Sequence, residues 1–288
     1  MPEVRAIWEL TRGEHGLMYG AGVLVGILVG GGDFGITAVF GFFTAFFIQA
    51  GTFALNDYCD VETDIANNRL DRPLVRGALT KDFAFIIACV ATALGILCSV
   101  VLTMLHGGLT LFLVALLLAA LGILYDIRIK ELFALGNLYI AFTMAVPFIY
   151  GGLIAGDIGG GLLILSLIAL FAGLGREVMK DIADMRGDEI RDVRSIARVY
   201  GIKKAKEVVT ASYSLAVGLS VVPFFLHSTP YYHNPLFITM VGGTDIIFAH
   251  TLYGLWKRHV NYEQLRKETL VAIAIGLLAF ICGFYTKC

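Results

Sequence analysis

The sequence predicts an all-α membrane protein with nine transmembrane helices around a central cavity and its N-terminus in the cytoplasm. Charged residues make up 16% of the 288 residues, well below the roughly 25% of soluble domains. Apolar runs of about 20 residues recur, which is the length that crosses a bilayer as a helix. These runs do not alternate between apolar and polar residues, so we expect helices rather than strands.

Nine apolar segments are the predicted spanning helices. They cover residues 16–32, 36–55, 83–103, 109–125, 133–154, 161–175, 207–226, 235–255 and 269–286. The 33 glycines suit such helices, because small residues let membrane helices approach closely. Before the first segment, Glu3, Glu9 and Glu14 interrupt the chain, so we expect a short interfacial helix and not a signal peptide. No stretch indicates a soluble appendage, and residues 1–288 are predicted to form a single integral-membrane domain.

The positive charges alternate with the apolar segments. Of the 22 Lys and Arg residues, 21 lie in the N-terminal segment or in the loops after the second, fourth, sixth and eighth apolar segments. With nine spans all of these lie on one side, and the positive-inside rule makes that side the cytoplasm. The chain is therefore predicted to be a multi-pass protein of the cell membrane. Its net charge of −1 indicates no nucleic-acid partner.

Both long cytoplasmic loops, 56–82 and 176–206, begin with aspartates at the same spacing. Residues 56–64 read NDYCDVETD and residues 181–188 read DIADMRGD, so each contains Asp-x2-Asp-x3-Asp. On a helix, at about 100° per residue, the three members fall within about 60° of arc. If each helix continues past its apolar segment, each cluster forms one oxygen-rich stripe at a helix end. The stripes consist of Asn56, Asp57, Asp60 and Asp64, and of Asp181, Asp184 and Asp188.

This chemistry indicates a magnesium site that holds a diphosphate. Facing carboxylates repel one another unless cations neutralise them. Oxygen ligands without His or Cys favour Mg²⁺ over zinc, and Mg²⁺ commonly shares a few carboxylates with substrate phosphates. Arg72, Arg76, Arg176 and Lys180 can contact an anion that the aspartates alone would repel. Metal and cations together stabilise a departing phosphate group. Turn-forming aspartates in ordinary solvated loops are the alternative, which the repeated spacing makes less attractive.

The motifs resemble those of the UbiA superfamily of intramembrane prenyltransferases. NDYCDVETD matches the family pattern NDxxDxxxD at every fixed position, and the following NRLDRPLVRG resembles its basic continuation. DIADMRGD matches the second aspartate motif. YDIRIK, residues 125–130, resembles the family's Tyr/Lys motif but is one residue longer than the usual YxxxK. Nine helices are also the family's number.

The resemblance implies a Mg²⁺-dependent enzyme that moves a prenyl group from its diphosphate to a lipophilic acceptor. All seven residues of the two stripes are then expected to hold Mg²⁺ bridged by the prenyl diphosphate. Arg72, Arg76, Lys130 and Lys180 are the expected diphosphate-binding residues. Asp60, Asp184 and Tyr125 are the expected catalytic residues; the ring face of Tyr125 can stabilise an allylic carbocation, although an interfacial tyrosine is an equally good interpretation.

The acceptor is less well specified. Residues 175–188, GREVMKDIADMRGD, most resemble the archaeal lipid-synthesising members of the family, which implies geranylgeranyl diphosphate as donor and geranylgeranylglyceryl phosphate as acceptor. An aromatic acceptor of a quinone pathway is the alternative. An ion-coupled transporter would use the two stripes as an ion site near the midplane, whereas here they lie at the membrane edge. A CDP-alcohol phosphotransferase needs motif glycines that NDYCDVETD lacks.

Two further polar residues are noted. Asp245 lies within the eighth apolar segment, where carboxylates are functional candidates by default. His15 lies at the cytoplasmic start of the first segment and is a candidate contact for the acceptor. A hydrogen-bonded buried aspartate and an interfacial histidine are the structural alternatives for these two positions.

Overall fold

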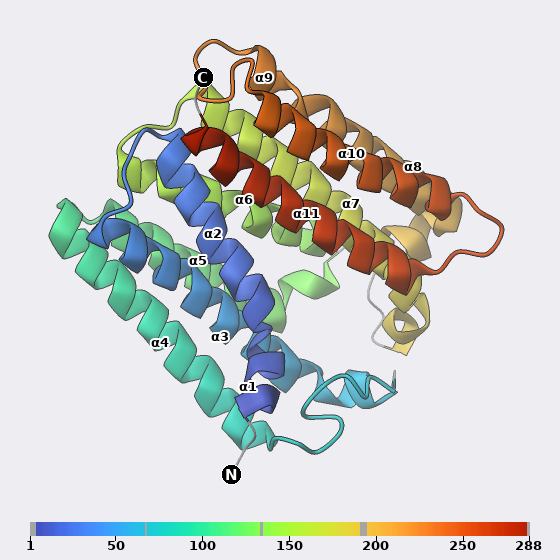
Figure 1. The fold of residues 1–288 in the computed structure, drawn as a ribbon. Helices are drawn as coiled ribbons and strands as arrows, with labels where there is room; N and C mark the ends of the chain where they lie inside the picture. Colours follow the sequence, from blue (N-terminus) through green and yellow to red (C-terminus); the bar gives the residue numbers. More distant parts are fainter. Residues whose placement is uncertain (1–3, 67, 133–134, 191–194, 287–288) are drawn as a thin grey trace.

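The apolar segments form helices that pack side by side (Figure 1). The computed structural model describes residues 4–66, 68–132, 135–190 and 195–286, apart from the side chains of residues 131 and 186–190. The helices are α1 (Val4–Thr11), α2 (Gly13–Val29), α3 (Ile36–Ala66), α4 (Lys81–His106), α5 (Thr110–Ile127), a 3-10 turn η1 (Ile129–Glu131), α6 (Leu135–Ala155), α7 (Gly160–Ile190), α8 (Ile196–Ser220), α9 (Val222–Phe225), α10 (Pro235–Leu255) and α11 (Tyr262–Tyr285). The described residues contain no strand.

Eight helices in the described part of the chain are long and apolar enough to cross a membrane. They are α3, α4, α5, α6, α7, α10, α11 and the stretch Ile196–Phe225. The all-helical membrane fold is thereby confirmed, whereas the count of nine is not. The first predicted segment forms α2, which has only 17 residues and is buried along much of its length.

Glycines explain how α2 fits among longer helices. A β-carbon on Gly26 would lie 2.2 Å from the carbonyl oxygen of Phe148, and one on Gly151 would lie 2.2 Å from the carbonyl oxygen of Val23. The backbones of α2 and α6 therefore touch at this crossing, which only glycine permits. On its other side, α2 receives the rings of Phe42 and Phe46 from α3 at glycine positions.

Two helices are much longer than their apolar segments. α3 and α7 each have 31 residues, and both continue beyond the apolar stretch into the aspartate motifs. An acidic stripe required each helix to continue past its apolar segment, and both helices do so, because both motifs begin on a helix and not in a loop. α3 ends at Ala66, and the chain then turns at Asn68, whose φ of 52° is left-handed.

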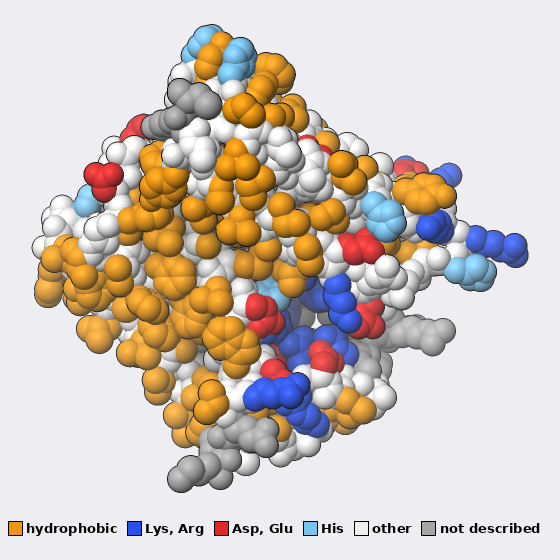
Figure 2. Space-filling view, in the orientation of Figure 1, with side chains coloured by type: hydrophobic (Ala, Val, Ile, Leu, Met, Phe, Trp, Pro, Cys, Tyr) orange, Lys and Arg blue, Asp and Glu red, His pale blue; other side chains and the backbone are white. Residues whose placement is uncertain are grey.

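The surface divides into an apolar belt and a polar end. Large apolar side chains such as Leu97, Leu113 and Ile246 are more than half exposed, as expected for a face that meets lipid tails. Figure 2 shows Lys, Arg, Asp and Glu side chains gathered around a hollow at one end of this belt. The cavity opens at this polar end, where both aspartate motifs lie.

Candidate active site

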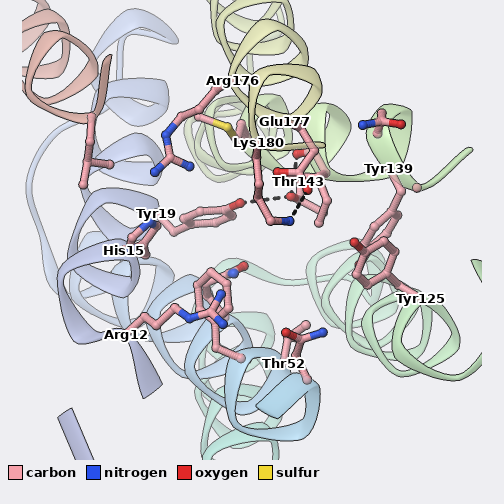
Figure 3. Close-up of a pocket in the computed structure, with 18 of the residues that line it drawn as sticks. Arg12, His15, Tyr19, Thr52, Tyr125, Tyr139, Thr143, Arg176, Glu177 and Lys180 are labelled. Carbon is pink, nitrogen blue, oxygen red and sulfur yellow. Dashed lines mark hydrogen bonds and ion pairs between the residues drawn. The ribbon is translucent and has the colours of Figure 1, made fainter. Parts of the chain in front are cut away.

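A cavity of about 520 Å³ lies between the two long helices that carry the motifs. Its walls come from α2, α3, α5, α6, α7 and α11, with η1 and the segment after α3 at its polar end. Of the predicted site residues, Asn56, Asp60, Asp64, Arg72, Tyr125, Lys130, Lys180, Asp181 and Asp184 line it. Asn56 and Asp181, which are 125 positions apart in the sequence, thus line the same cavity. Figure 3 shows side chains entering this space from several helices.

The first motif divides into cavity-lining residues and one buried anchor. Asp57 does not line the cavity: its side chain is 1% exposed, and its Oδ1 lies 2.9 Å from Arg12 Nη2 and 3.3 Å from Arg72 Nη1. Arg72 also approaches Asp64, with 3.8 Å between Nε and Oδ2. Asp57 therefore holds two guanidinium groups at the cavity edge, and Asp64 lies on the open side of Arg72.

Asp60 is the centre of a polar network. Lys130 Nζ donates to its Oδ1 at 2.5 Å, and the Asn56 amide donates to its Oδ2 at 3.1 Å. The same amide donates to Asp126 at 2.9 Å. The ring of Tyr125 stacks on that of Tyr139 with centroids 4.8 Å apart. The longer spacing in YDIRIK is accommodated because η1 turns Lys130 back toward α3.

The second motif faces this network from α7. Asp181 accepts a 2.7 Å hydrogen bond from Asn137 on α6. Asp184 lies 4.0 Å from Arg69, which belongs to the segment after α3 and so links the two motifs. Lys180 donates to Glu177 at 2.6 Å (Figure 3). The side chain of Asp188 lies outside the described residues.

Arg76 is the one expected diphosphate ligand that does not line the cavity. Its guanidinium pairs with Glu9 on α1 and donates to the carbonyl oxygen of Asp71. This pairing, with a second from Arg5, lowers the pKa of Glu9. Arg76 thus ties α1 to the segment after α3.

Two cations at the cavity mouth are held in place by their surroundings. The guanidinium of Arg12 lies 4.2 Å from the ring centroid of Phe53. Burial, and after it the charge of Arg72, lower the pKa of Arg12 to about 10, so Arg12 remains a cation at neutral pH. Arg69 donates to both oxygens of Asp71 at 3.1 and 3.3 Å. Burial alone would raise the pKa of Asp71, but this pairing outweighs it and lowers the pKa.

The donor set fits a hard divalent cation. No three His, Cys, Asp or Glu side chains among the described residues already surround a common point closely enough to be a formed metal site. The cavity does, however, present carboxylates from both motifs and no thiol, and one oxygen of the neighbouring Asp126 is buried without a hydrogen-bond partner. A buried unpaired carboxylate oxygen is costly and is stabilised by a cation. Such an all-oxygen set suits Mg²⁺.

Several lining residues were not singled out from the sequence. They are Arg12, Tyr19, Asp126, Asn137, Tyr139, Glu177 and Arg266. Asp126 could have been identified from the sequence, because it is a carboxylate at the end of an apolar run, directly after Tyr125. Arg12 could not, because only the left-handed turn at this residue, with φ 46°, brings it back over Asp57. Asp245 lies away from the cavity and accepts a 2.9 Å hydrogen bond from Ser220, whereas His15 lines the cavity.

Comparisons with known proteins agree with this geometry. The model of the UbiA prenyltransferase family matches residues 20–267. Digeranylgeranylglyceryl phosphate synthase of Archaeoglobus fulgidus is 41% identical over 288 residues, which cover 98% of this chain and 96% of that protein. A solved structure of a digeranylgeranylglyceryl phosphate synthase is 27% identical, with a TM-score of 0.71 and 99% of both chains covered. A UbiA homologue from Archaeoglobus fulgidus, solved with GPP and Mg²⁺, has the same fold, with a TM-score of 0.71, 16% identity, and 98% of this chain and 100% of that chain covered. The chain therefore belongs to the UbiA prenyltransferase family and is a prenyltransferase.

Proposed function

We propose that this enzyme transfers a geranylgeranyl group from its diphosphate to geranylgeranylglyceryl phosphate, and that it requires Mg²⁺. The observation that carries the proposal is the convergence of two acidic helix ends, on α3 and α7, across one cavity whose deeper walls are apolar. A diphosphate with an isoprenoid tail has this same division into a charged head and a hydrocarbon chain. The identities of donor and acceptor are taken from the name of the 41% identical relative.

The polar residues of the cavity have two proposed roles, metal binding and diphosphate binding. Asn56, Asp60 and Asp64 on one side and Asp181 and Asp184 on the other are the proposed metal ligands. Lys130, Lys180 and Arg72 are the proposed contacts to the diphosphate oxygens, and Asp57 positions Arg72 through their 3.3 Å ion pair. Bound Mg²⁺ supplies Lewis-acid stabilisation of the leaving diphosphate. Lys130 pairs with Asp60 and Lys180 pairs with Glu177. Each ammonium group can exchange its carboxylate partner for the more negative diphosphate.

The reaction that follows is substitution at the allylic carbon. The bond between the first prenyl carbon and the diphosphate oxygen breaks, and the acceptor hydroxyl oxygen forms the new ether bond. The hydroxyl proton leaves with the departing diphosphate. Stacked Tyr125 and Tyr139 present aromatic surface at one side of the cavity (Figure 3), where a ring face stabilises a developing cation. Apolar walls exclude water, which would otherwise capture that cation.

We also propose that α2 is the ninth span and that the cavity opens to the cytoplasm. The segregation of 21 of the 22 basic residues supports this topology, because only an odd number of spans keeps them on one side. The cell membrane is the proposed location. Family membership leaves the ion-coupled transporter without support, and the aromatic acceptor remains as an outcome of the experiment below.

The test uses the purified full-length protein in lipid vesicles with Mg²⁺ and geranylgeranyl diphosphate. The acceptors are geranylgeranylglyceryl phosphate, 4-hydroxybenzoate and dihydroxynaphthoate, each assayed for product by mass spectrometry. We expect the doubly alkylated glyceryl phosphate and no prenylated aromatic. Transfer to an aromatic acceptor alone would contradict the proposed acceptor.

A further inference from the structure

One wall of the cavity carries basic side chains to which the proposed function gives no role. Arg176 on α7, Arg266 on α11 and His15 on α2 all line the cavity. Figure 3 shows Arg176 and His15 on one side of Tyr19, with Tyr125 and Tyr139 on the opposite side. The proposed metal ligand Asn56 belongs to the network that contains Lys130 and Asp126, next to the stacked tyrosines.

Arg176 and Arg266 form no ion pair with another described side chain, and polar atoms of this wall are left without a partner. Nε of Arg176, Nε of Arg266 and Nδ1 of His15 are buried and make no hydrogen bond. By contrast, Lys130, Lys180, Arg12 and Arg69 each have a carboxylate within 3.1 Å. Buried donors without partners are rare and costly, and an anionic ligand would satisfy them.

Nearby carboxylates are engaged elsewhere or lie at the rim. Glu177 accepts from Lys180 at 2.6 Å, and Asp184 has Arg69 at 4.0 Å. Glu14 Oε1 lies 3.8 Å from His15 Nδ1, and the Glu14 side chain is 55% exposed. None of these forms an ion pair with Arg176 or Arg266 among the described residues, although Asp184 and Glu177 act on Arg266 from a longer distance.

α11 adds a second, independent feature to this wall. Arg266, Leu270, Ile273 and Leu277 all line the cavity, and their spacing of four, three and four residues places them on one helix face. The face begins with a guanidinium at the polar end and continues as hydrocarbon toward the membrane interior. Such a face matches a lipid whose phosphate lies at the polar end and whose chain extends inward.

We propose that Arg176, Arg266 and His15 form the binding site for the phosphate of the acceptor, and that Leu270, Ile273 and Leu277 contact its isoprenoid chain. This inference rests on the proposed function, because an aromatic acceptor would bring no phosphate. In a glyceryl phosphate, the phosphorus and a hydroxyl oxygen on the adjacent carbon are separated by four bonds. Anchoring the phosphate therefore fixes the attacking hydroxyl within a few ångströms of this wall.

The experiment compares Michaelis constants for the two substrates in vesicles. Arg266→Gln and Arg176→Gln are each expected to raise KM for geranylgeranylglyceryl phosphate about 10- to 100-fold, the effect of losing a charge-assisted hydrogen bond. KM for geranylgeranyl diphosphate should stay within about twofold of the wild-type value, and Arg266→Lys should restore part of the loss. The matched control is Lys267→Gln, one residue along α11, because Lys267 is exposed and pairs with Glu263 at 2.7 Å.

A measurement on the wild-type enzyme removes dependence on variants that fold poorly. Glycerol 1-phosphate, which carries the phosphate without the chain, should inhibit competitively against the acceptor and not against the donor. Competition against the donor, an unchanged acceptor KM in both arginine variants, or equal rises in both KM values would each overturn the inference. Failure of the wild-type enzyme to use geranylgeranylglyceryl phosphate would instead overturn the proposed function.

Discussion

Lys130 Nζ lies 2.5 Å from Asp60 Oδ1, although the two residues are 70 positions apart. Both side chains are only about 15% exposed, at 15% and 14%, so the pair is largely shielded from water. The lysine thus neutralises one carboxylate of the first motif in the absence of ligands. The proposed mechanism needs the opposite arrangement, with Asp60 on the metal and Lys130 on the diphosphate. The pair is therefore expected to separate when both ligands bind.

Lys130→Gln tests this exchange of partners. We expect KM for the prenyl diphosphate to rise about 10- to 100-fold, because one charge-assisted contact to it is lost. Binding of Mn²⁺ alone, followed by electron paramagnetic resonance, should become tighter, because Asp60 loses the cation that pairs with it. Weaker Mn²⁺ binding in this variant would show that Lys130 supports the metal site and does not compete with it.

The two motifs are expected to be equally necessary. Asp60→Ala and Asp184→Ala should each lower kcat/KM by on the order of 100-fold or more, because each removes a proposed metal ligand and so weakens the stabilisation of the departing diphosphate. Asp33→Ala is the control, since Asp33 is an exposed aspartate in the connection between α2 and α3. Steady-state assays of all three variants decide the point, and full activity in Asp60→Ala would remove the metal assignment.

The features of the site that depend on local sequence were predictable. Hydropathy located the helices, and the Asp-x2-Asp-x3-Asp spacing placed Asp60 and Asp64 on one face because α3 continues to Ala66. The spacing also placed Asp57 on this stripe, but it does not predict that Asp57 is 1% exposed and pairs with Arg12. This burial depends on a tertiary contact, because the turn before α2 brings Arg12, 45 residues away in the sequence, onto Asp57.

Arg76 and Arg266 also show that motif membership does not predict which arginines line the cavity. Arg76 belongs to the motif's basic continuation, yet its guanidinium pairs with Glu9 on α1. Arg266 belongs to no motif, yet α11 brings it into the cavity beside Arg176. Spacing along the chain specifies one helix face, but the partner of that face is determined by packing of distant helices.

Removal of divalent metal should abolish transfer. Prenyl transfer should stop when EDTA is added and return with excess Mg²⁺ or Mn²⁺, because both accept oxygen ligands in octahedral geometry. Zn²⁺ should restore far less activity, since the lining of the cavity offers carboxylates and no cysteine. Product formation in vesicles after metal exchange is the measurement, and transfer that persists in EDTA would contradict metal dependence.

Asp57→Ala should act on stability as well as on activity. It leaves Arg12 and Arg72 without their shared carboxylate, and breaking a buried ion pair from one side costs about 3–5 kcal/mol. The expected result is a clearly lower unfolding temperature in detergent, in addition to weaker diphosphate binding. Asp33→Ala is the comparison, because Asp33 is exposed and its removal should leave the unfolding temperature nearly unchanged. Equal unfolding temperatures for the two variants would refute the anchoring role of Asp57.

The crossing of α2 and α6 should be the position most sensitive to a single added methyl group. In Gly151→Ala the new β-carbon would lie 2.2 Å from the carbonyl oxygen of Val23 and 2.7 Å from the amide nitrogen of Ile27, so two backbones must separate. Overpacking of this kind costs about 1–3 kcal/mol, and the rigidity of backbone atoms favours the upper end. Because α2 carries His15 and Tyr19 into the cavity, the same shift should also lower activity.

Gly218→Ala on α8 is the matched control for that variant. No atom lies within 4 Å of the position that its β-carbon would take, and alanine is a better helix former than glycine by about 0.5–1 kcal/mol. Unfolding temperatures in detergent should therefore move in opposite directions, down for Gly151→Ala and slightly up for Gly218→Ala. A Gly151→Ala protein as stable as the wild type would mean that α2 and α6 can separate without loss, and the short helix α2 would then not be fixed by this contact.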